Sequence, residues 1–355
     1  MRVGLILLLL VGFGATAASA GAASARGSFT ASDGARVEYF SHGAADAPTL
    51  LFAPAFTASA RLYADRFGAG LPGYRVVVLQ LRGHGEGGGC TFRGLDYCTQ
   101  AQGPAEGTYR GFRMSRLAAD LRELKDHLRL QHFAMGGHSL GMNVVTEYLS
   151  DYGTQGLEGL FVYDQSPKNL AGSDPENASF PAGVATYPLG QFTQLVANYE
   201  AFKPAADYSD VPADVRAMMG GPTGNPVFDP TNPAPAFLLR AADWYRWARF
   251  ADRMNGKVLS LLFWNSITSD YTDVYRLVAE AKVPTLVYGG KSSLVPWRAM
   301  EWVHQQIPGS EFLLFGPDVG VHGAFLNPPP SGPRFMRTVH SFLERRVRPG
   351  IVQPS

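Results

Sequence analysis

One ten-residue stretch, Phe133 to Met142, limits what this chain can fold into more than any other part of the sequence. A short apolar run stops at Gly137-His138-Ser139-Leu140-Gly141, and a helical pattern begins directly after it. In this Gly-x-Ser-x-Gly spacing, a strand enters a sharp turn with the serine at its apex and a helix leaves it. The N–H groups at the start of that helix favour a negative charge that develops beside the serine. The stretch therefore predicts that Ser139 is a nucleophile, and the alternative is a glycine-rich turn with an incidental serine.

Buried-type strands alternate with amphipathic helices on both sides of this turn. Strands are expected at 49–53, 74–79, 133–136, 159–164, 283–288 and 311–315, after a hairpin at 28–41. Helices are expected at 60–67, 111–130, 143–149, 298–307 and 332–346. This alternation predicts an α/β fold with a mostly parallel sheet that helices cover on both faces.

From about residue 169 to residue 281 the alternation stops, and proline, asparagine and aromatic residues dominate. Helical patterns occur there at 191–202, 241–254 and 270–281. The segment is predicted to be an inserted helical cap, or lid. Residues such as Trp244, Trp247 and Trp264 could line an acyl pocket, although the lid's own core is the simpler place for each of them. The predicted division is a signal peptide at 1–20, a first core part at 21–168, the cap at 169–282, and a second core part at 283–355.

The N-terminus has the pattern of an export signal. Arg2 gives a positive start, an apolar core follows at Gly4 to Val11, and Ala18-Ser19-Ala20 provides a small-x-small cleavage site before Gly21. The apolar core is short for a membrane span, and an uncleaved anchor is the alternative. The pattern predicts a secreted or periplasmic protein with no stable membrane span after cleavage. A formal net charge of +1 gives no indication of a nucleic-acid partner.

The chain has two cysteines, Cys90 and Cys98, which lie close together in a glycine-rich loop. In an exported protein such a pair predicts a disulfide, and two free thiols are the alternative. No cluster of histidines accompanies the pair, so a metal site is not predicted there. Asn177-Ala178-Ser179 is a glycosylation sequon that matters only in a eukaryotic host.

Five segments resemble successive landmarks of the α/β-hydrolase superfamily, in particular its capped branch of esterases, C–C hydrolases, cofactor-free haloperoxidases, epoxide hydrolases and haloalkane dehalogenases. They are Thr49 to Gly85, Gly136 to Gly141, Val162 to Pro167, Pro284 to Pro296 and Gly320 to Pro328. The resemblance covers nearly all of the chain outside the signal and the insertion. It implies the fold strongly and any one reaction weakly.

The resemblance implies that Ser139 is the nucleophile and His322 its base. Epoxide hydrolases and haloalkane dehalogenases carry an aspartate at the nucleophile position, so a serine argues for acyl transfer. His322 follows the last expected strand, in the chain order serine, acid, histidine that this fold uses. His84, in an Arg-Gly-His-Gly turn, is the alternative base.

The acid departs from the commonest pattern of the superfamily. The turn that usually holds an aspartate carries Ser292 and Ser293 here, with no acidic residue between Ala281 and Met300. Some members supply the acid one strand earlier, where this chain has Asp164. A carboxylate is needed to orient the histidine, so Asp164 is the expected acid, and Asp318 is the alternative.

The oxyanion hole is expected to use the backbone N–H groups of Leu140 and Phe56. Leu140 follows the nucleophile, and Phe56 lies in the loop after the 49–53 strand. Pro54-Ala55 replaces the His-Gly that relatives show in that loop.

These residues favour a secreted serine hydrolase that cleaves carboxylic esters, or a related acyl bond, in small-molecule substrates. An acyl-enzyme on Ser139 requires no metal and no organic cofactor. An amidase, lactonase, thioesterase or C–C hydrolase would use the same residues. The other hypothesis is a ligand-binding protein on this fold with little or no turnover, which the serines at 292 and 293 and the altered Pro54-Ala55 loop favour. The oligomeric state is left open.

Overall fold

The computed structural model of the 355-residue chain describes residues 24–84, 91–92, 95–96, 109–169, 205–218 and 256–351. Several predicted features lie outside these described residues: the signal segment, Cys90, Cys98, Asn177, the helices at 191–202 and 241–254, Trp244 and Trp247.

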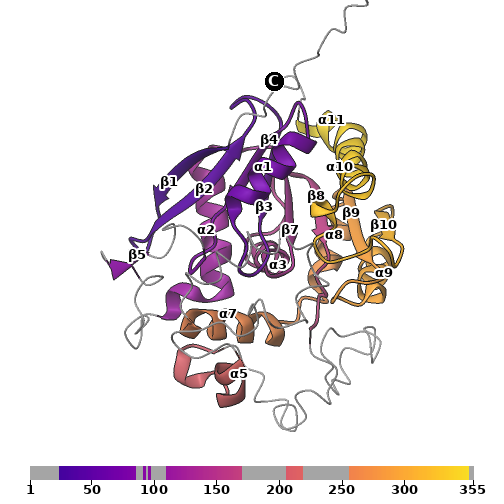
Figure 1. Cartoon of the computed structure of the whole chain (residues 1–355). Coiled ribbons are helices and arrows are strands. Elements are labelled where there is room, and N and C mark those ends of the chain that lie inside the picture. Colours follow the sequence, from indigo (N-terminus) through magenta and orange to yellow (C-terminus); the bar gives the residue numbers. More distant parts are fainter. Residues whose placement is uncertain are drawn as a thin grey trace, which may run out of the picture.

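An eight-stranded sheet forms the centre of the described structure, in the order β1-β2-β4-β3-β7-β8-β9-β10 (Figure 1). Its strands are β1 (Ala25–Thr30), β2 (Arg36–His42), β3 (Thr49–Ala53), β4 (Arg75–Leu79), β7 (Phe133–His138), β8 (Leu157–Tyr163), β9 (Thr285–Gly290) and β10 (Glu311–Phe315). β1 and β2 form an antiparallel hairpin, β2 pairs antiparallel with β4, and the remaining pairs are parallel. The predicted α/β fold with a mostly parallel sheet is confirmed.

The central strands are mostly apolar on both faces because both of their faces are covered. In β3, Leu51 and Ala53 belong to one apolar cluster, whereas Leu50 and Phe52 belong to another. Successive side chains of a strand point to opposite faces of the sheet, so these two clusters are the two layers of the core. A short continuous apolar run therefore predicted each of these strands correctly.

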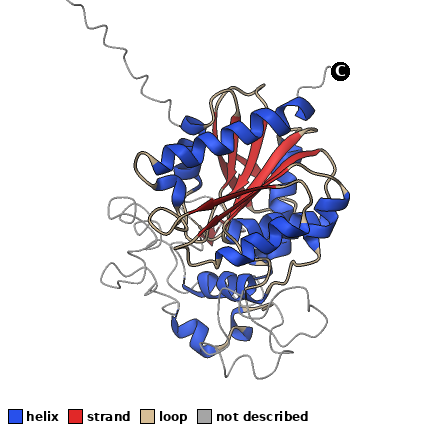
Figure 2. Ribbon diagram, turned by 90° about the vertical axis from the view of Figure 1, so that its right-hand side faces the viewer, coloured by secondary structure: helices blue, strands red, loops and turns tan. Residues whose placement is uncertain are grey.

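Helices cover both faces of the sheet (Figure 2). The cluster that contains Leu51 receives buried residues from α2 (Met114–His127), α3 (Leu140–Tyr152), α8 (Val274–Glu280) and α9 (Trp297–Gln306). The cluster that contains Leu50 receives them from α1 (Ala60–Gly70) and α10 (Ser331–Phe342). The chain continues from α10 through a π-helical turn, η9 (Leu343–Val347), to α11 (Arg348–Ile351). Short elements complete the described structure: β5 (Thr91–Phe92), β6 (Leu95–Asp96), η1 (Tyr109–Phe112), η5 (Tyr208–Asp210), α5 (Ala213–Met218) and η8 (Ala324–Leu326).

Helix α7 (Gly256–Thr268) was not predicted from the sequence. Apolar residues occur all around it, and Leu259, Leu261, Leu262 and Trp264 are each almost completely buried. A helix that is buried on every side has no amphipathic period to detect. Trp264 belongs to the same apolar cluster as Leu51 of β3, so it packs with the core of the sheet and not with a separate core of the insertion. The helix predicted at 270–281 was wrong at its start, because the helical residues begin only at Val274.

The two ends of the predicted insertion meet at one neck. Lys168 and Asp270 form an isolated antiparallel bridge, and their side chains form an ion pair at 2.8 Å. The N–H of Tyr271 donates to the carbonyl of Pro167 at 2.9 Å. Helix α8 lies beyond this neck and packs against α3 and α9 of the core. Helix α7, which precedes the neck, already contributes Leu261 and Leu262 to the core cluster that contains Leu51, so core packing resumes before residue 270. The division at residue 282, like the cap itself, stays a prediction.

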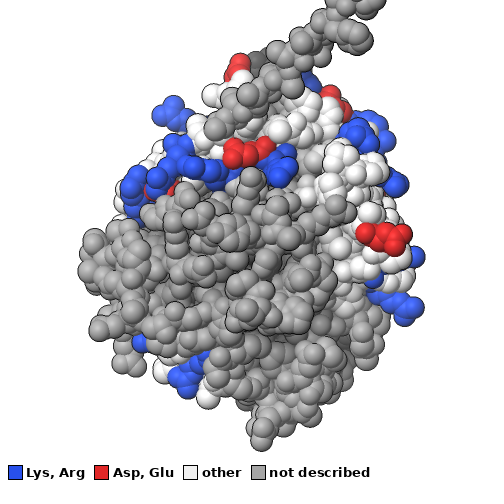
Figure 3. Space-filling model, in the orientation of Figure 1, with Lys and Arg blue, Asp and Glu red and all other residues white. Residues whose placement is uncertain are grey.

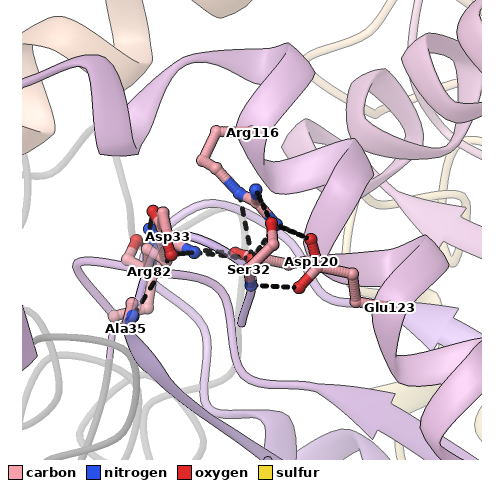
Figure 4. Close-up of polar contacts among 8 residues, drawn as sticks. Ser32, Asp33, Ala35, Arg82, Arg116, Asp120 and Glu123 are labelled. Atoms are coloured by element: carbon pink, nitrogen blue, oxygen red, sulfur yellow. Dashed lines mark hydrogen bonds and ion pairs between the residues drawn. The ribbon is translucent and has the colours of Figure 1, made fainter. Parts of the chain in front are cut away.

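A buried ionic network ties the turn after β4 to two other parts of the core (Figure 4). Arg82 is 2% exposed, and its guanidinium donates two hydrogen bonds to Asp120 of α2, at 2.6 and 2.7 Å. It donates two more to Asp33 of the β1–β2 turn, at 2.5 and 2.9 Å. Burial opposes the charge, but the two carboxylates outweigh it and raise the pKa of Arg82 above its usual value. This network fixes the turn that carries His84.

The described surface mixes both signs of charge. On the face in Figure 3, Lys and Arg side chains lie beside Asp and Glu side chains where the surface is described. One exposed ion pair of the described surface joins Arg345 to Glu311 at 2.9 Å. Within the described ranges, the structure has no helix that is both long and apolar enough to cross a membrane.

Candidate active site

The topology brings the expected site residues to one edge of the sheet. The carboxyl ends of neighbouring parallel strands lie at the same edge, and the strands are about 4.8 Å apart. The residues that follow strands β3, β7, β8, β9 and β10 at this edge include Phe56, Ser139, Asp164, Ser293 and His322, respectively. Segments that are far apart in the sequence are therefore neighbours here.

Ser139 sits at the apex of a strained turn between β7 and α3. Its backbone has φ 54° and ψ −127°, a conformation that costs a non-glycine residue on the order of 1–3 kcal/mol. The glycines on each side allow this turn. A Cβ atom on Gly137 would lie 2.5 Å from the carbonyl oxygen of Gly141, and a Cβ on Gly141 would lie 2.1 Å from the carbonyl oxygen of Ala53. The Ser139 N–H donates to the Tyr163 carbonyl of β8 at 3.1 Å, which ties the turn to the neighbouring strand.

His322 and Asp164 form a buried pair. The Nδ1 of His322 lies 2.7 Å from Oδ2 of Asp164, so the N–H donates to the carboxylate and Nε2 is left as the basic nitrogen. Asp164 is completely buried and follows β8 with φ 50°. Burial raises the pKa of Asp164, and the hydrogen bond and charge of His322 act against that rise. Asp318, the alternative acid, is exposed at the surface.

Ser293 contacts the same pair from the end of β9. Its hydroxyl donates to Oδ2 of Asp164, the oxygen that also accepts from His322. The Ser293 Oγ is 3.5 Å from Nδ1 of His322. Two residues from two neighbouring strand ends thus donate to one carboxylate oxygen, which belongs to a residue from a third.

His138 packs behind the pair. Its ring stacks on Tyr163 with centroids 4.0 Å apart and lies 4.3 Å from the ring of His322. Tyr63 of α1 places its hydroxyl 2.5 Å from Nδ1 of His138, and the N–H of Ala55 donates to that hydroxyl. Burial, followed by the nearness of His322, holds the pKa of His138 well below its ordinary value, so this ring is neutral at neutral pH.

The expected oxyanion donors come from two segments in close contact. Leu140 begins α3, and the tight approach of Gly141 to Ala53 brings that helix start against the loop containing Phe56. Phe56 is half-buried, and its ring contacts His84 edge-on at 5.7 Å and Phe263 of α7 at 6.2 Å. These contacts hold the loop between the turn after β4 and the insertion.

His84 is placed as a structural residue rather than as a base. Its Nδ1 donates to the carbonyl of Arg82 at 2.9 Å, two residues back in its own turn. Burial lowers the pKa of His84 to about 4, which is far from the range that suits a base at neutral pH.

Comparison with known proteins agrees with this architecture. The family model described as "alpha/beta hydrolase fold" matches residues 48–320, which is more than half of the chain. The chain belongs to the α/β-hydrolase fold family. A comparison with curated proteins found no match.

Several solved structures resemble this α/β hydrolase. A bromoperoxidase from Bacillus anthracis has a TM-score of 0.61 and 18% identity, covering 90% of this chain and 99% of that one. A thermophilic esterase from Thermogutta terrifontis also has 0.61 and 18%, covering 91% and 99%. An esterase from Rhodococcus sp. ECU1013 has 0.58 and 17%, covering 92% and 100%. At these identities the likeness shows the fold alone.

Three buried side chains of the site carry groups that metal ions can bind. Within the described part of the chain, His138, Asp164 and His322 offer ligand atoms within 4.8 Å of one another. Nδ1 of His322 is hydrogen-bonded to Oδ2 of Asp164, and Nδ1 of His138 is hydrogen-bonded to the Tyr63 hydroxyl. These contacts fit a base oriented by its carboxylate better than a set of metal ligands.

Sequence reasoning overlooked the supporting residues of the site. In the sequence, Ser293 stands out only as the place where a carboxylate is missing, and nothing marks Tyr63 as a residue of the site. The position of Ser293 could have indicated its role. It occurs where the superfamily usually has an acid, and its strand is expected beside the strand that ends at Asp164.

Proposed function

We propose that this chain is a serine hydrolase that cleaves carboxylic esters of small-molecule substrates. The observation that carries the proposal is the buried His322–Asp164 pair at the sheet edge where Ser139 holds a strained turn conformation. A serine hydroxyl is a weak nucleophile until a base takes its proton, and an oriented histidine supplies that base.

In the proposed reaction, Nε2 of His322 accepts the Ser139 proton as Oγ attacks the ester carbonyl. The N–H groups of Leu140 and Phe56 stabilise the resulting oxyanion. The tetrahedral intermediate expels the alcohol, which takes the proton from His322, and an acyl-enzyme remains. Water then attacks the acyl-enzyme with His322 again as base, and the acid is released as Ser139 regains its proton. Asp164 keeps its negative charge throughout and stabilises the imidazolium.

The preference for ester substrates rests on the activities of proteins with similar structures. Esterases from Rhodococcus sp. ECU1013, Thermogutta terrifontis and Exiguobacterium antarcticum have similar structures. The same residues could serve an amidase, lactonase or thioesterase. A panel of aryl esters of increasing acyl length, lactones, thioesters and anilides would separate these classes.

The export of the enzyme is part of the proposal. Residues 1–20 would direct the chain out of the cytoplasm, and Cys90 and Cys98 would form a disulfide in that oxidising compartment. The N-terminus of the purified mature protein, expected at Gly21, tests the first statement. Thiol labelling before and after reduction tests the second, with two reactive thiols expected only after reduction.

Covalent labelling tests the enzyme proposal directly. A fluorophosphonate probe should label the wild-type protein and the variant Ser292→Ala, which lacks a nearby exposed serine, but not Ser139→Ala. Absence of labelling in the folded wild type would refute the proposal and favour a ligand-binding protein on this fold.

A further inference from the structure

The hydroxyl of Ser293 stands where the superfamily pattern leads one to expect a carboxylate. It follows β9, donates to Oδ2 of Asp164, and lies 3.5 Å from Nδ1 of His322. The carboxylate of this site belongs to Asp164, which follows the neighbouring strand β8. Ser293 and Asp164 therefore both lie beside Nδ1 of His322, and the serine donates a hydrogen bond to the carboxylate.

The surroundings of Ser293 fix the direction of its hydroxyl proton. The N–H of Val295 donates to Oγ at 3.3 Å, which uses one of its lone pairs. The Ser293 N–H donates to the carbonyl of Gly290 at 3.1 Å, so its backbone is also held. With a donor already facing Oγ from one side, its single proton is directed to Asp164.

The loop that carries Ser293 is joined to the segment that carries His322. The Ser292 N–H donates to the carbonyl of Gly320 at 2.9 Å, two residues before His322. A Cβ atom on Gly290 would lie 2.2 Å from that same carbonyl oxygen, so the two segments touch. The side chain of Ser292 is exposed, whereas Ser293 is half-buried. Only the second serine of the pair faces the site.

We propose that Ser293 is a positioning residue of the hydrolase, which holds the Asp164 carboxylate toward His322 from the place an acid would otherwise occupy. This inference rests on the proposed function of the site. Asp164 is fully buried, and a buried carboxylate needs hydrogen bonds to remain ionised and fixed in orientation. Ser293 and His322 supply the two donors, and both use the same oxygen.

The first test compares Ser293→Ala with Ser292→Ala and Ser293→Thr, using a chromogenic ester. Ser293→Ala should lower kcat about tenfold with little change in KM, because Ser293 orients Asp164 without touching substrate. The acid limb of the kcat/KM profile should move up by about half a pH unit, because a carboxylate that has lost a donor holds the shared proton more tightly. Ser293→Thr keeps the hydroxyl and should restore both values. Ser293→Ala behaving like Ser292→Ala would overturn the proposal.

The second test moves the acid. Asp164→Asn should lose most activity, and the double variant Asp164→Asn/Ser293→Asp should regain at least tenfold of it, because a carboxylate at 293 can reach Nδ1 of His322. A double variant that is no more active than Asp164→Asn contradicts the inference that residue 293 lies where an acid can orient His322.

A third readout requires no turnover, so failure of this inference can be told from failure of the proposed function. In Ser139→Ala protein, the Nδ1 proton of His322 should give a low-field proton NMR signal, assigned by its loss in Asp164→Asn. Adding Ser293→Ala should shift or broaden that signal, and adding Ser292→Ala should leave it unchanged. An unchanged signal with Ser293→Ala refutes the positioning role whatever the enzyme's activity.

Discussion

Replacement of Asp164 by asparagine isolates the charge of the proposed acid, because the side chain keeps its shape. In the structure the charge lies 2.7 Å from Nδ1 of His322. With an effective dielectric constant of about 20, an imidazolium and a carboxylate at that separation attract each other by roughly 6 kcal/mol. An asparagine oxygen recovers part of this interaction. The expected loss of kcat is about 1,000- to 10,000-fold, with KM nearly unchanged, because the imidazolium forms only as the reaction proceeds.

Steady-state hydrolysis of a p-nitrophenyl ester measures this loss, and the rate of fluorophosphonate labelling checks it without relying on deacylation. Asp318→Asn is the matched control, because Asp318 lies four residues before His322 and is exposed. It should retain activity within about twofold. Asp164→Asn with activity within tenfold of the wild type, in a folded protein, would refute the assignment of the acid. Loss of activity in Asp318→Asn alone would transfer the role to that residue.

Three further substitutions test the framework of the site. Arg82→Met should lower the free energy of unfolding by about 3–5 kcal/mol in denaturant titrations, because the Asp120 carboxylate stays buried without its main partner. His84→Asn should make the free energy of unfolding less dependent on pH below neutrality. Because the folded-state pKa of His84 is about 4, the unfolded chain binds the proton first, and the free energy of unfolding of the wild type should fall by about 2 kcal/mol between pH 7 and pH 5. Gly141→Ala should cost about 3 kcal/mol and abolish labelling by the probe, since its Cβ would collide with the Ala53 carbonyl.

Each of these substitutions has a control of the same chemistry at a more exposed position. Arg122→Met removes a half-exposed guanidinium of α2, and His127→Asn removes an exposed imidazole from the end of that helix. Gly316→Ala adds a methyl group where nothing lies within 4 Å. All three controls should stay within about 0.5 kcal/mol of the wild type. A test substitution that behaves like its control contradicts the role given to that residue.

The core strands and the turn at Ser139 could be predicted because local sequence determines them. Buried strands such as β3 are apolar on both faces apart from their first residue, and the turn requires small residues at Gly137 and Gly141, where a Cβ would collide with backbone. Helices on the outside of the sheet gave a clear stripe of apolar residues. Helix α7 gave none because it is buried on all sides, which removes the contrast between its faces.

The partners of the site residues could not be predicted in the same way. Asp164 and Ser293 are 129 residues apart, and their contact depends on β8 and β9 being neighbours in the sheet. The sequence placed both at strand ends but could not show that the serine donates to the carboxylate. Similarly, the contact of Tyr63 with His138 joins α1 to β7 across 75 residues. Such pairs depend on strand order, which no local pattern specifies.

The neck formed by Lys168 and Asp270 has a consequence for how such an enzyme can be remodelled. Paired residues of an antiparallel bridge have their Cα atoms about 5 Å apart, a gap that a turn of a few residues can span. The chain between Lys168 and Asp270 therefore forms a closed loop, and the entropic cost of closing a loop grows only slowly with its length. An exchange at this point leaves the strand order unchanged, but helix α7 lies within the exchanged chain and its Phe263 contacts Phe56. A replacement segment therefore has to keep α7, and the chain before α7 is the part whose length and sequence can vary.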